Sequence, residues 1–195
     1  LMSHAEGVNI KRRRVLIAST AAVGAVGVGA IATPFVRSWY PSAKAEAAGA
    51  AVVTDIASIE NGQMITLKYR GKPIFVVKRT EDMLANLSKV APKLADPESN
   101  GSVQPDNCKN ETRSIQPEIL VVEGVCTHLG CAPIFRPEVG AADLGGADWM
   151  GGFFCPCHGS MYDLAGRVYS SMPAPLNLPV PIYKIEDTIL TVGEA

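Results

Sequence analysis

The sequence predicts a mostly antiparallel β domain carried on a single N-terminal transmembrane helix. Three observations predict this class. Residues 15–36 contain no charged side chain. From Val52 onward, short runs of apolar residues alternate with polar positions and end at turn residues, a pattern typical of antiparallel strands. Two segments, 126–131 and 155–160, hold four of the five cysteines and two of the three histidines, which indicates a metal site.

The uncharged segment fits a membrane anchor. Its 22 residues reach about 33 Å as a helix, which is enough to cross the apolar core of a bilayer. The basic run Lys11–Arg14 lies directly before it. The positive-inside rule therefore places residues 1–14 in the cytoplasm and the β domain on the other side of the membrane, where a disulfide can form.

The same region fits an export signal. Residues 12–16, Arg-Arg-Arg-Val-Leu, match a twin-arginine signal, the export route for proteins that are already folded. The alternative is a cleaved signal peptide with an A-x-A-like site at Ala43–Ala45. The length of the uncharged segment favours a retained helix. Residues 37–51, rich in alanine, then form a linker that can be helical or extended, or serve as a passive spacer.

The β domain begins at Val52. Residues 64–69 and 73–77 predict a hairpin, and Thr80 starts a helix that runs to about Val90. The polar residues 96–114 predict a long surface loop.

Two further strand signals lead into the cysteine and histidine segments. Residues 119–122 precede the first segment and residues 150–154 precede the second. Residues 170–181, which include four prolines, predict an irregular cover over these loops. A closing hairpin is expected from residues 182–185 and 189–192.

The two cysteine and histidine segments together offer six side chains that can bind a metal. They read Cys126-Thr-His128-Leu-Gly-Cys131 and Cys155-Pro-Cys157-His158-Gly-Ser. A tetrahedral zinc site takes four ligands and leaves two of these six side chains unused. An all-cysteine 2Fe–2S site uses no imidazole. A 2Fe–2S cluster with two thiolates on one iron and two imidazoles on the other, beside a disulfide, uses all six.

The segments resemble the Rieske iron–sulfur subunits of bacterial cytochrome bc complexes. The similarity extends over Met161-Tyr162-Asp163, Ala165-Gly166-Arg167 and Pro173-Ala174-Pro175, and also over residues 71–75 and the N-terminal anchor. It therefore covers most of the chain. It implies a head of two parts, with a cluster-binding subdomain of about 117–176 inserted into a base of about 52–116 and 177–195. It also implies a hinge at about 42–51 on which the head swings.

The resemblance implies a role for each residue of the site. Cys126 and Cys155 are expected on the inner iron of one Rieske 2Fe–2S cluster, and His128 and His158 on the outer iron. Cys131 and Cys157 are expected to form a disulfide, and His158 to contact the quinol and accept its proton. Four further residues are expected around the cluster: Leu129, Gly130, Ser160 and Tyr162. The Ser160 and Tyr162 hydroxyls are expected to donate to a cluster sulfide and to the Cys126 sulfur.

The family also implies partners and a location. We expect a respiratory ubiquinol–cytochrome c oxidoreductase in the bacterial inner membrane, with cytochrome b and c-type cytochrome subunits, ubiquinol and lipid as partners, in a dimeric complex. Nucleic acid is not expected, because the net charge is −1. Alternatives are the Rieske subunit of another periplasmic oxidoreductase, such as an arsenite-oxidase-like enzyme, or a zinc-stabilised binding module.

The chain departs from the family pattern in two places. Residues 132–154 between the loops resemble an insertion, and Met172 stands where a glycine usually precedes Pro-Ala-Pro. Cys108 lies in the predicted surface loop without an expected partner, so we predict a free thiol.

Overall fold

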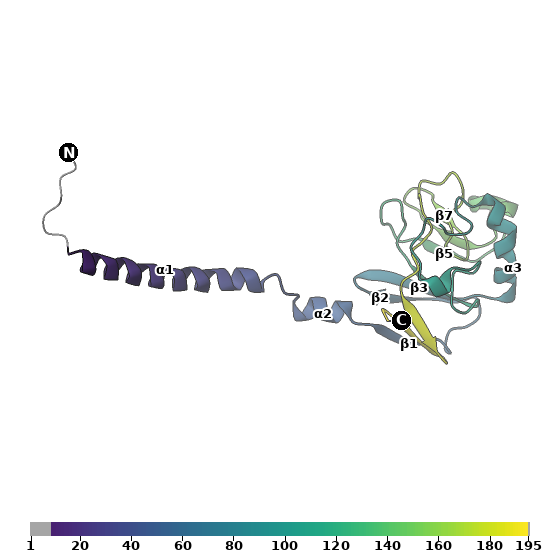
Figure 1. Ribbon diagram of the computed structural model, residues 1–195. Coiled ribbons are helices and arrows are strands. Elements are labelled where there is room, and N and C mark those ends of the chain that lie inside the picture. The colour runs from purple at the N-terminus through teal and green to yellow at the C-terminus, as the bar shows by residue number, and fades with distance from the viewer. Residues whose placement is uncertain (1–8, 195) are drawn as a thin grey trace. The chain divides into compact units, whose positions relative to one another are not determined.

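The uncharged N-terminal segment forms one long helix in the computed structural model, which describes residues 9–194 (Figure 1). Helix α1 spans Ile10–Arg37, and the Asn9 side chain caps it by accepting a hydrogen bond from the Arg12 amide at 3.1 Å. The helix is long and apolar enough to cross a membrane. It contains the predicted residues 15–36 and begins five residues earlier, so the basic run is helical too. Of the expected cytoplasmic segment, residues 1–8 lie outside the described part.

The predicted linker contains a second, short helix. Helix α2 spans Ala43–Gly49, and the Ser42 hydroxyl accepts a hydrogen bond from the Ala45 amide at 3.2 Å. The chain divides into two compact units near this point, at Ala47 and Ala48. We describe each unit by itself.

The second unit, the head, is mostly antiparallel β, as predicted. Its strands pair into three sheets of three strands, in the orders β1-β9-β8, β2-β3-β4 and β5-β6-β7. In Figure 1, β5 and β7 lie at one end of the head and β1 lies at the other, beside the C-terminus. The strands are β1 Val52–Asp55, β2 Met64–Tyr69, β3 Lys72–Lys78, β4 Ile119–Glu123, β5 Ile134–Arg136, β6 Gly152–Phe154, β7 Met161–Tyr162, β8 Tyr183–Glu186 and β9 Ile189–Val192.

Local sequence explains the elements that were predicted. Strands β2 and β3 pair with Tyr69 opposite Lys72, so Arg70 and Gly71 form a two-residue turn with positive φ angles of 48° and 78°. Such turns match the twist of a hairpin. Helix α3, Glu81–Val90, begins after Thr80, whose side chain accepts a hydrogen bond from the Met83 amide. The short 3-10 helices are η1 Ala91–Lys93, η2 Asp106–Cys108, η3 Ala142–Leu144 and η4 Gly146–Asp148.

Aromatic contacts join the β2-β3-β4 sheet, which we call the middle sheet, to the β5-β6-β7 sheet, whose strands flank the second cysteine and histidine segment. Phe75 of β3 stacks on Phe153 of β6 with ring centroids 5.7 Å apart, and Phe135 of β5 packs on Phe153 at 5.6 Å. Gly124 lies against the face of the Phe75 ring, where a Cβ atom would overlap the ring carbons. The chain therefore enters the first metal loop over a ring that only glycine can approach so closely.

The prediction of a surface loop at residues 96–114 is confirmed in part, because the segment is irregular apart from η2 and many of its residues are exposed. Four of its residues are buried: Ser99, Cys108, Arg113 and Ser114. Polar side chains can be buried when they are hydrogen-bonded, and the Arg113 guanidinium donates to the Leu178 carbonyl at 2.8 Å. Cys108 is a free thiol, as predicted, but it is buried, with its sulfur 3.7 Å from the Tyr183 hydroxyl.

Residues 132–154 are more ordered than an insertion suggests. They contain β5, η3 and η4, and Trp149 is fully buried with its ring stacked on Tyr169 at 6.0 Å. Strand β4, which lies inside the expected subdomain of 117–176, pairs with β3 of the middle sheet. This pairing favours a subdomain that starts after Glu123.

Candidate metal centre

The two cysteine and histidine segments fold into loops with the same backbone hydrogen bonds. In the first loop, the Cys126 amide donates to the Cys131 carbonyl at 2.8 Å and the Gly130 amide donates to the Cys126 carbonyl at 2.9 Å. In the second loop, the Cys155 amide donates to the Ser160 carbonyl at 2.8 Å and the Gly159 amide donates to the Cys155 carbonyl at 2.9 Å. Gly130 and Gly159 have positive φ angles of 85° and 79°, a conformation that glycine adopts without strain.

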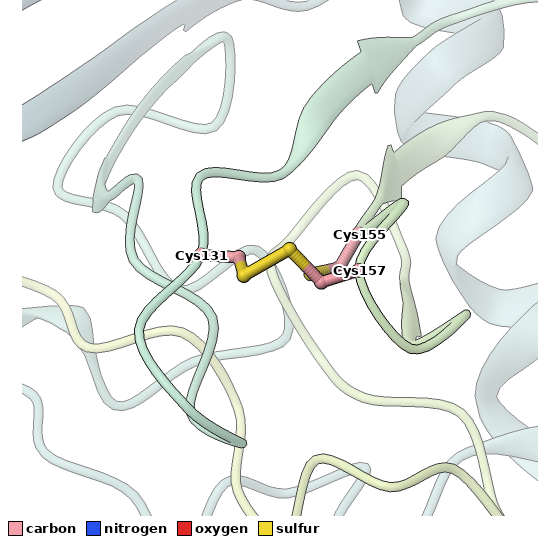
Figure 2. Close-up of side chains that lie close together, drawn as sticks. All are labelled: Cys131, Cys155 and Cys157. Carbon is pink, nitrogen blue, oxygen red and sulfur yellow. A yellow bond between two sulfur atoms is a disulfide. The ribbon is translucent and has the colours of Figure 1, made fainter.

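The four cysteines of the two loops divide into a disulfide and two free thiols. Cys131 and Cys157 form the predicted disulfide between the loops, with Cα atoms 6.6 Å apart. Figure 2 shows Cys155 on the same loop as Cys157, beside the bridge. The sulfur atoms of these three residues lie within 4.8 Å of one another. Two of them are oxidised and cannot act as thiolates, so Cys155 is the candidate ligand of this group.

The two histidines face each other at the ends of the loops. Their rings meet edge to face, with centroids 4.6 Å apart. His128 is half-buried, and its Nδ1 atom is buried without a hydrogen-bond partner. His158 is exposed. A buried polar atom without a partner is costly in a folded protein, and a metal ion would satisfy the Nδ1 atom of His128.

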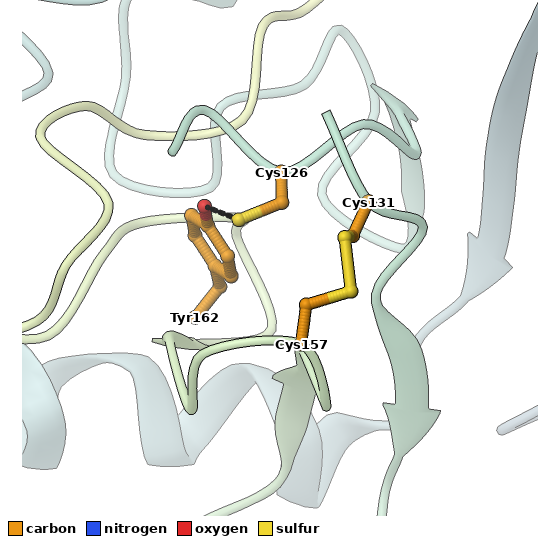
Figure 3. Close-up of a disulfide and its surroundings, with 4 residues drawn as sticks. All are labelled: Cys126, Cys131, Cys157 and Tyr162. Atoms are coloured by element: carbon orange, nitrogen blue, oxygen red, sulfur yellow. Dashed lines mark hydrogen bonds between the residues drawn. A yellow bond between two sulfur atoms is a disulfide. The ribbon is translucent and has the colours of Figure 1, made fainter. Parts of the chain in front are cut away.

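The first thiol is held by Tyr162 from the far side of the second loop. The Tyr162 hydroxyl lies 3.2 Å from the Cys126 sulfur (Figure 3). It also lies 3.2 Å from the Thr127 hydroxyl, which donates to the Leu176 carbonyl at 2.6 Å. The Ser160 hydroxyl is buried and accepts a hydrogen bond from the Ala174 amide at 3.1 Å. These contacts tie the loops to the proline-rich cover.

The surroundings shift the pKa values of the two free thiols in opposite directions. Burial raises the pKa of Cys126, but hydrogen bonds from the Tyr162 hydroxyl and the His128 amide lower it by more, so the net shift is downward. Burial raises the pKa of Cys155, and its contact with Cys126 adds to the rise. Burial, followed by the nearby Cys126, raises the pKa of Tyr162, which remains a hydrogen-bond donor at neutral pH.

This donor set fits a 2Fe–2S cluster with mixed ligands. The two loops present two buried free thiols and two adjacent imidazoles, one with a buried nitrogen in need of a partner, which are two candidate sulfur and two candidate nitrogen ligands. The two thiols and the two imidazoles do not have to surround one common point, because in such a cluster the thiols bind one iron and the imidazoles bind the other.

Comparison with known proteins identifies the family. A family model described as "Rieske [2Fe-2S] domain" matches residues 49–184. The chain belongs to the Rieske family. A second model, described as "Ubiquitinol-cytochrome C reductase Fe-S subunit TAT signal", matches residues 2–42. The Rieske identity removes the zinc-module alternative, and the second match agrees with the twin-arginine signal predicted from the sequence.

The full-length relatives narrow the identification. The chain is 57% identical over 192 residues to the ubiquinol–cytochrome c reductase iron–sulfur subunit of Allochromatium vinosum, covering 97% of this chain and 92% of that protein. It is 40% identical to the subunit of Blastochloris viridis, covering 98% of both chains. For Rhodospirillum rubrum the identity is 44%, covering 93% and 91%.

The Rieske chain is therefore the electron-transfer subunit of a ubiquinol–cytochrome c reductase, with a 2Fe–2S cofactor and an N-terminal membrane anchor. This decides against the arsenite-oxidase-like alternative.

Two contributors to the site were missed by the sequence analysis. Thr127 joins the first loop to Tyr162 and to the cover, and Gly159 forms the turn of the second loop. The signal for Gly159 was present, because a glycine stands four residues after the first cysteine in both segments. Thr127 offered no signal, since its partners lie 35 and 49 residues away in the chain.

Proposed function

We propose that Cys126 and Cys155 bind one iron of the Rieske cluster and that His128 and His158 bind the other. The observation that carries this assignment is the division of the four loop cysteines. Because Cys131 and Cys157 form the disulfide, Cys126 and Cys155 are the thiols left in the two loops. The histidine pair with ring centroids 4.6 Å apart supplies the remaining two ligands.

The surrounding residues adjust the cluster and its access. When bound, a cluster of this type accepts one electron at a potential above that of all-cysteine clusters. The Tyr162 hydroxyl donates a hydrogen bond to the Cys126 sulfur, which favours the more negative, reduced state. We assign a similar donor role toward a cluster sulfide to Ser160, which is buried beneath the loops.

The exposed face of the loops is assigned to the quinol. His158 is exposed. With one ring nitrogen on the iron, its outward nitrogen, when it carries no proton of its own, can accept a hydrogen bond, and then the proton, from a hydroxyl of ubiquinol as the electron leaves. Leu129, 72% exposed beside Gly130 at the tip of the first loop, offers an apolar contact for the cytochrome b subunit that holds the quinol.

Delivery of the electron requires the head to move. We assign the hinge to residues 42–51, which contain the short helix α2 and are rich in alanine. Extension of this helix lengthens the tether, because an extended residue spans more than twice the helical rise. The head then delivers its electron to the c-type cytochrome subunit. The basic run Lys11–Arg14 at the start of α1 favours a cytoplasmic N-terminus, a periplasmic head and the bacterial inner membrane as the location. We assign the subunit to a dimeric complex there.

Isotope labelling tests the ligand assignment directly. Protein grown with ¹⁵N-histidine and reduced should show hyperfine coupling of the cluster to two histidine nitrogens in electron–nuclear double resonance. The chain has three histidines, so His4→Gln serves as the control and should keep both couplings. Coupling to one nitrogen or none would disprove the assignment.

Quinol–cytochrome c activity of membranes with Leu129→Ala tests the docking role: the rate should fall while the potential of the cluster is unchanged.

A further inference from the structure

Three arginines are buried in the head behind the second metal loop. Arg79, Arg113 and Arg167 are 2%, 1% and 3% exposed. Among the residues that the structure describes, Asp163 is the only buried carboxylate. Burial of an unpaired charge is costly, and burial lowers the pKa of both Arg79 and Arg113 to about 10, so both stay charged at neutral pH. The contacts that these side chains make must offset that cost.

The carboxylate of Asp163 makes all of its hydrogen bonds within its own turn, residues 163–167. It accepts hydrogen bonds from the amides of Ala165 and Arg167 at 2.9 and 2.7 Å, and it pairs with the Arg167 guanidinium at 2.8 Å. Residues 163–167 therefore form a closed turn whose acid is shared with one arginine.

Arg79 and Arg113 bind the outside of that turn through its backbone carbonyls. Arg79 donates to Leu164 at 2.9 Å, and Arg113 donates to Ala165 at 2.9 Å. Arg79 follows β3 and Arg113 lies in residues 96–114, so both belong to parts of the head outside the metal loops. We call these two side chains the carbonyl clamp.

The clamped turn carries Tyr162. Residues 161–169 form a tight hairpin in which Tyr162 bridges to Val168 and the Asp163 amide donates to the Arg167 carbonyl at 2.9 Å. The Tyr162 backbone is also held by strand β6. Its carbonyl oxygen packs so closely on Gly152 that a Cβ atom at Gly152 would overlap it. The Tyr162 ring points from this hairpin to the Cys126 sulfur of the opposite loop (Figure 3).

We propose that Arg79 and Arg113 are positioning residues that hold the Tyr162 hydroxyl on the Cys126 sulfur and thereby help to set the reduction potential of the cluster. This inference rests on the proposed assignment of Cys126 as a ligand. A guanidinium is suited to the task because its planar fork binds several carbonyls in one fixed geometry. Arg113 does so with the carbonyls of Ala165 and Leu178, while its Nε donates to Gln104 at 2.9 Å.

The test is a double-mutant cycle between Arg113→Lys and Tyr162→Phe, measured as the midpoint potential of the purified, cluster-loaded head on its membrane anchor. Lysine keeps the positive charge, and therefore its electrostatic effect on the cluster, but loses the planar set of guanidinium donors that binds the carbonyls. We expect Arg113→Lys to lower the potential by less than Tyr162→Phe does. In the Tyr162→Phe background, Arg113→Lys should lower it no further.

Each other outcome has a distinct meaning. If Tyr162→Phe lowers the potential and Arg113→Lys leaves it unchanged, the clamp is disproved and the ligand assignment survives. Additive shifts would also overturn the proposal, because Arg113 would then act on the cluster without Tyr162. If Tyr162→Phe itself has no effect, both the hydrogen bond to a ligand and the clamp are wrong.

A matched control and a milder variant complete the design. Arg136→Lys changes an arginine of β5 that pairs with Asp143 at the surface, and it should leave the potential unaltered. If Arg113→Lys fails to assemble a cluster, Gln104→Ala removes the acceptor of the Arg113 Nε, together with the hydrogen bond from Gln104 to the Ser99 carbonyl, and should give a smaller shift in the same direction. A fall in melting temperature without any shift in potential, in whichever variant assembles, would reduce the clamp to a purely structural role and overturn the proposal.

Discussion

The two metal loops have the same backbone and different side chains. Aligned by their hydrogen bonds, Cys126 matches Cys155 and Gly130 matches Gly159. The histidines do not match: His128 stands two residues after its cysteine and His158 stands three. The disulfide cysteines differ by more, since Cys131 closes the first loop, whereas Cys157 occupies the position equivalent to His128.

Because the side chains are shifted along the same backbone, equivalent positions of the two loops carry different residues toward the interior and toward solvent. Cys131 of the first loop is matched in the second by Ser160, which is buried and bound to the proline-rich cover. The position of the exposed His158 is held in the first loop by Leu129, also exposed. The loops are equivalent in the backbone that presents the ligands and differ in what they present to the interior and to a partner.

The largest effect is expected from the histidines, because both are proposed to bind the same iron. His128→Ala and His158→Ala should each abolish the electron paramagnetic resonance signal of the reduced cluster, although one ring is half-buried and the other is exposed. Cys108→Ser is the control and should keep the full signal, since that thiol lies in another part of the core. Loss of the signal in Cys108→Ser would mean that the four ligands are wrongly assigned.

The disulfide should have the next largest effect, on stability. It closes a sequence separation of 26 residues, so its loss is expected to lower the free energy of unfolding by about 3–4 kcal/mol. Cys131→Ser and Cys157→Ser should lose the same amount, because either variant opens the same bridge. Both should also lower the midpoint potential as the loops loosen. Thermal unfolding measures the first effect and redox titration the second; normal values of both in either variant would contradict the role of the bridge.

The glycines test whether the two backbones are equivalent. Gly130 and Gly159 have nearly the same positive φ, and a Cβ atom would meet no neighbour at either position. Gly130→Ala and Gly159→Ala should therefore cost the same, about 1–2 kcal/mol each from the left-handed conformation alone, as measured by chemical denaturation. Gly140→Ala, which has a φ of 78° in open space outside the loops, should cost as much without changing the potential. Unequal losses at the two loop glycines would show that the loops differ in more than their side chains.

Local signals explain what could be predicted from the sequence. The β2–β3 hairpin and α3 carry their own turn and cap residues, such as Gly71 and Thr80, and both were predicted correctly. The disulfide was also predicted, because a cluster with two imidazole ligands needs only two of the four cysteines in the two loops.

Long-range contacts explain what could not. Nothing in the sequence indicated that Arg113 is buried, because its partners, Ala165 and Leu178, lie 52 and 65 residues further along the chain. Polar composition predicts exposure only when no such partners exist, so the burial of four residues within the loop 96–114 was not predicted. Strand β5 was missed because its three residues are too few to show a period of two and end at Arg136, just before a proline.

The smallest effect should come from single hydroxyls, and it distinguishes the contacts of the two loops. Tyr162→Phe removes a hydrogen bond to the Cys126 sulfur. Such a bond is worth about 1 kcal/mol, which corresponds to ~40 mV for a one-electron couple because 59 mV is a tenfold change. The potential should fall, since the bond favours the reduced state. Ser160→Ala should also lower the potential, and in addition it leaves the buried Ala174 amide without its acceptor, so it should lower the melting temperature more than Ser170→Ala, a control at an exposed site. Redox titration and calorimetry on the same samples measure both quantities. A potential that rises in Tyr162→Phe would show that the hydroxyl favours the oxidised cluster, and the donor role of Tyr162 would then be wrong.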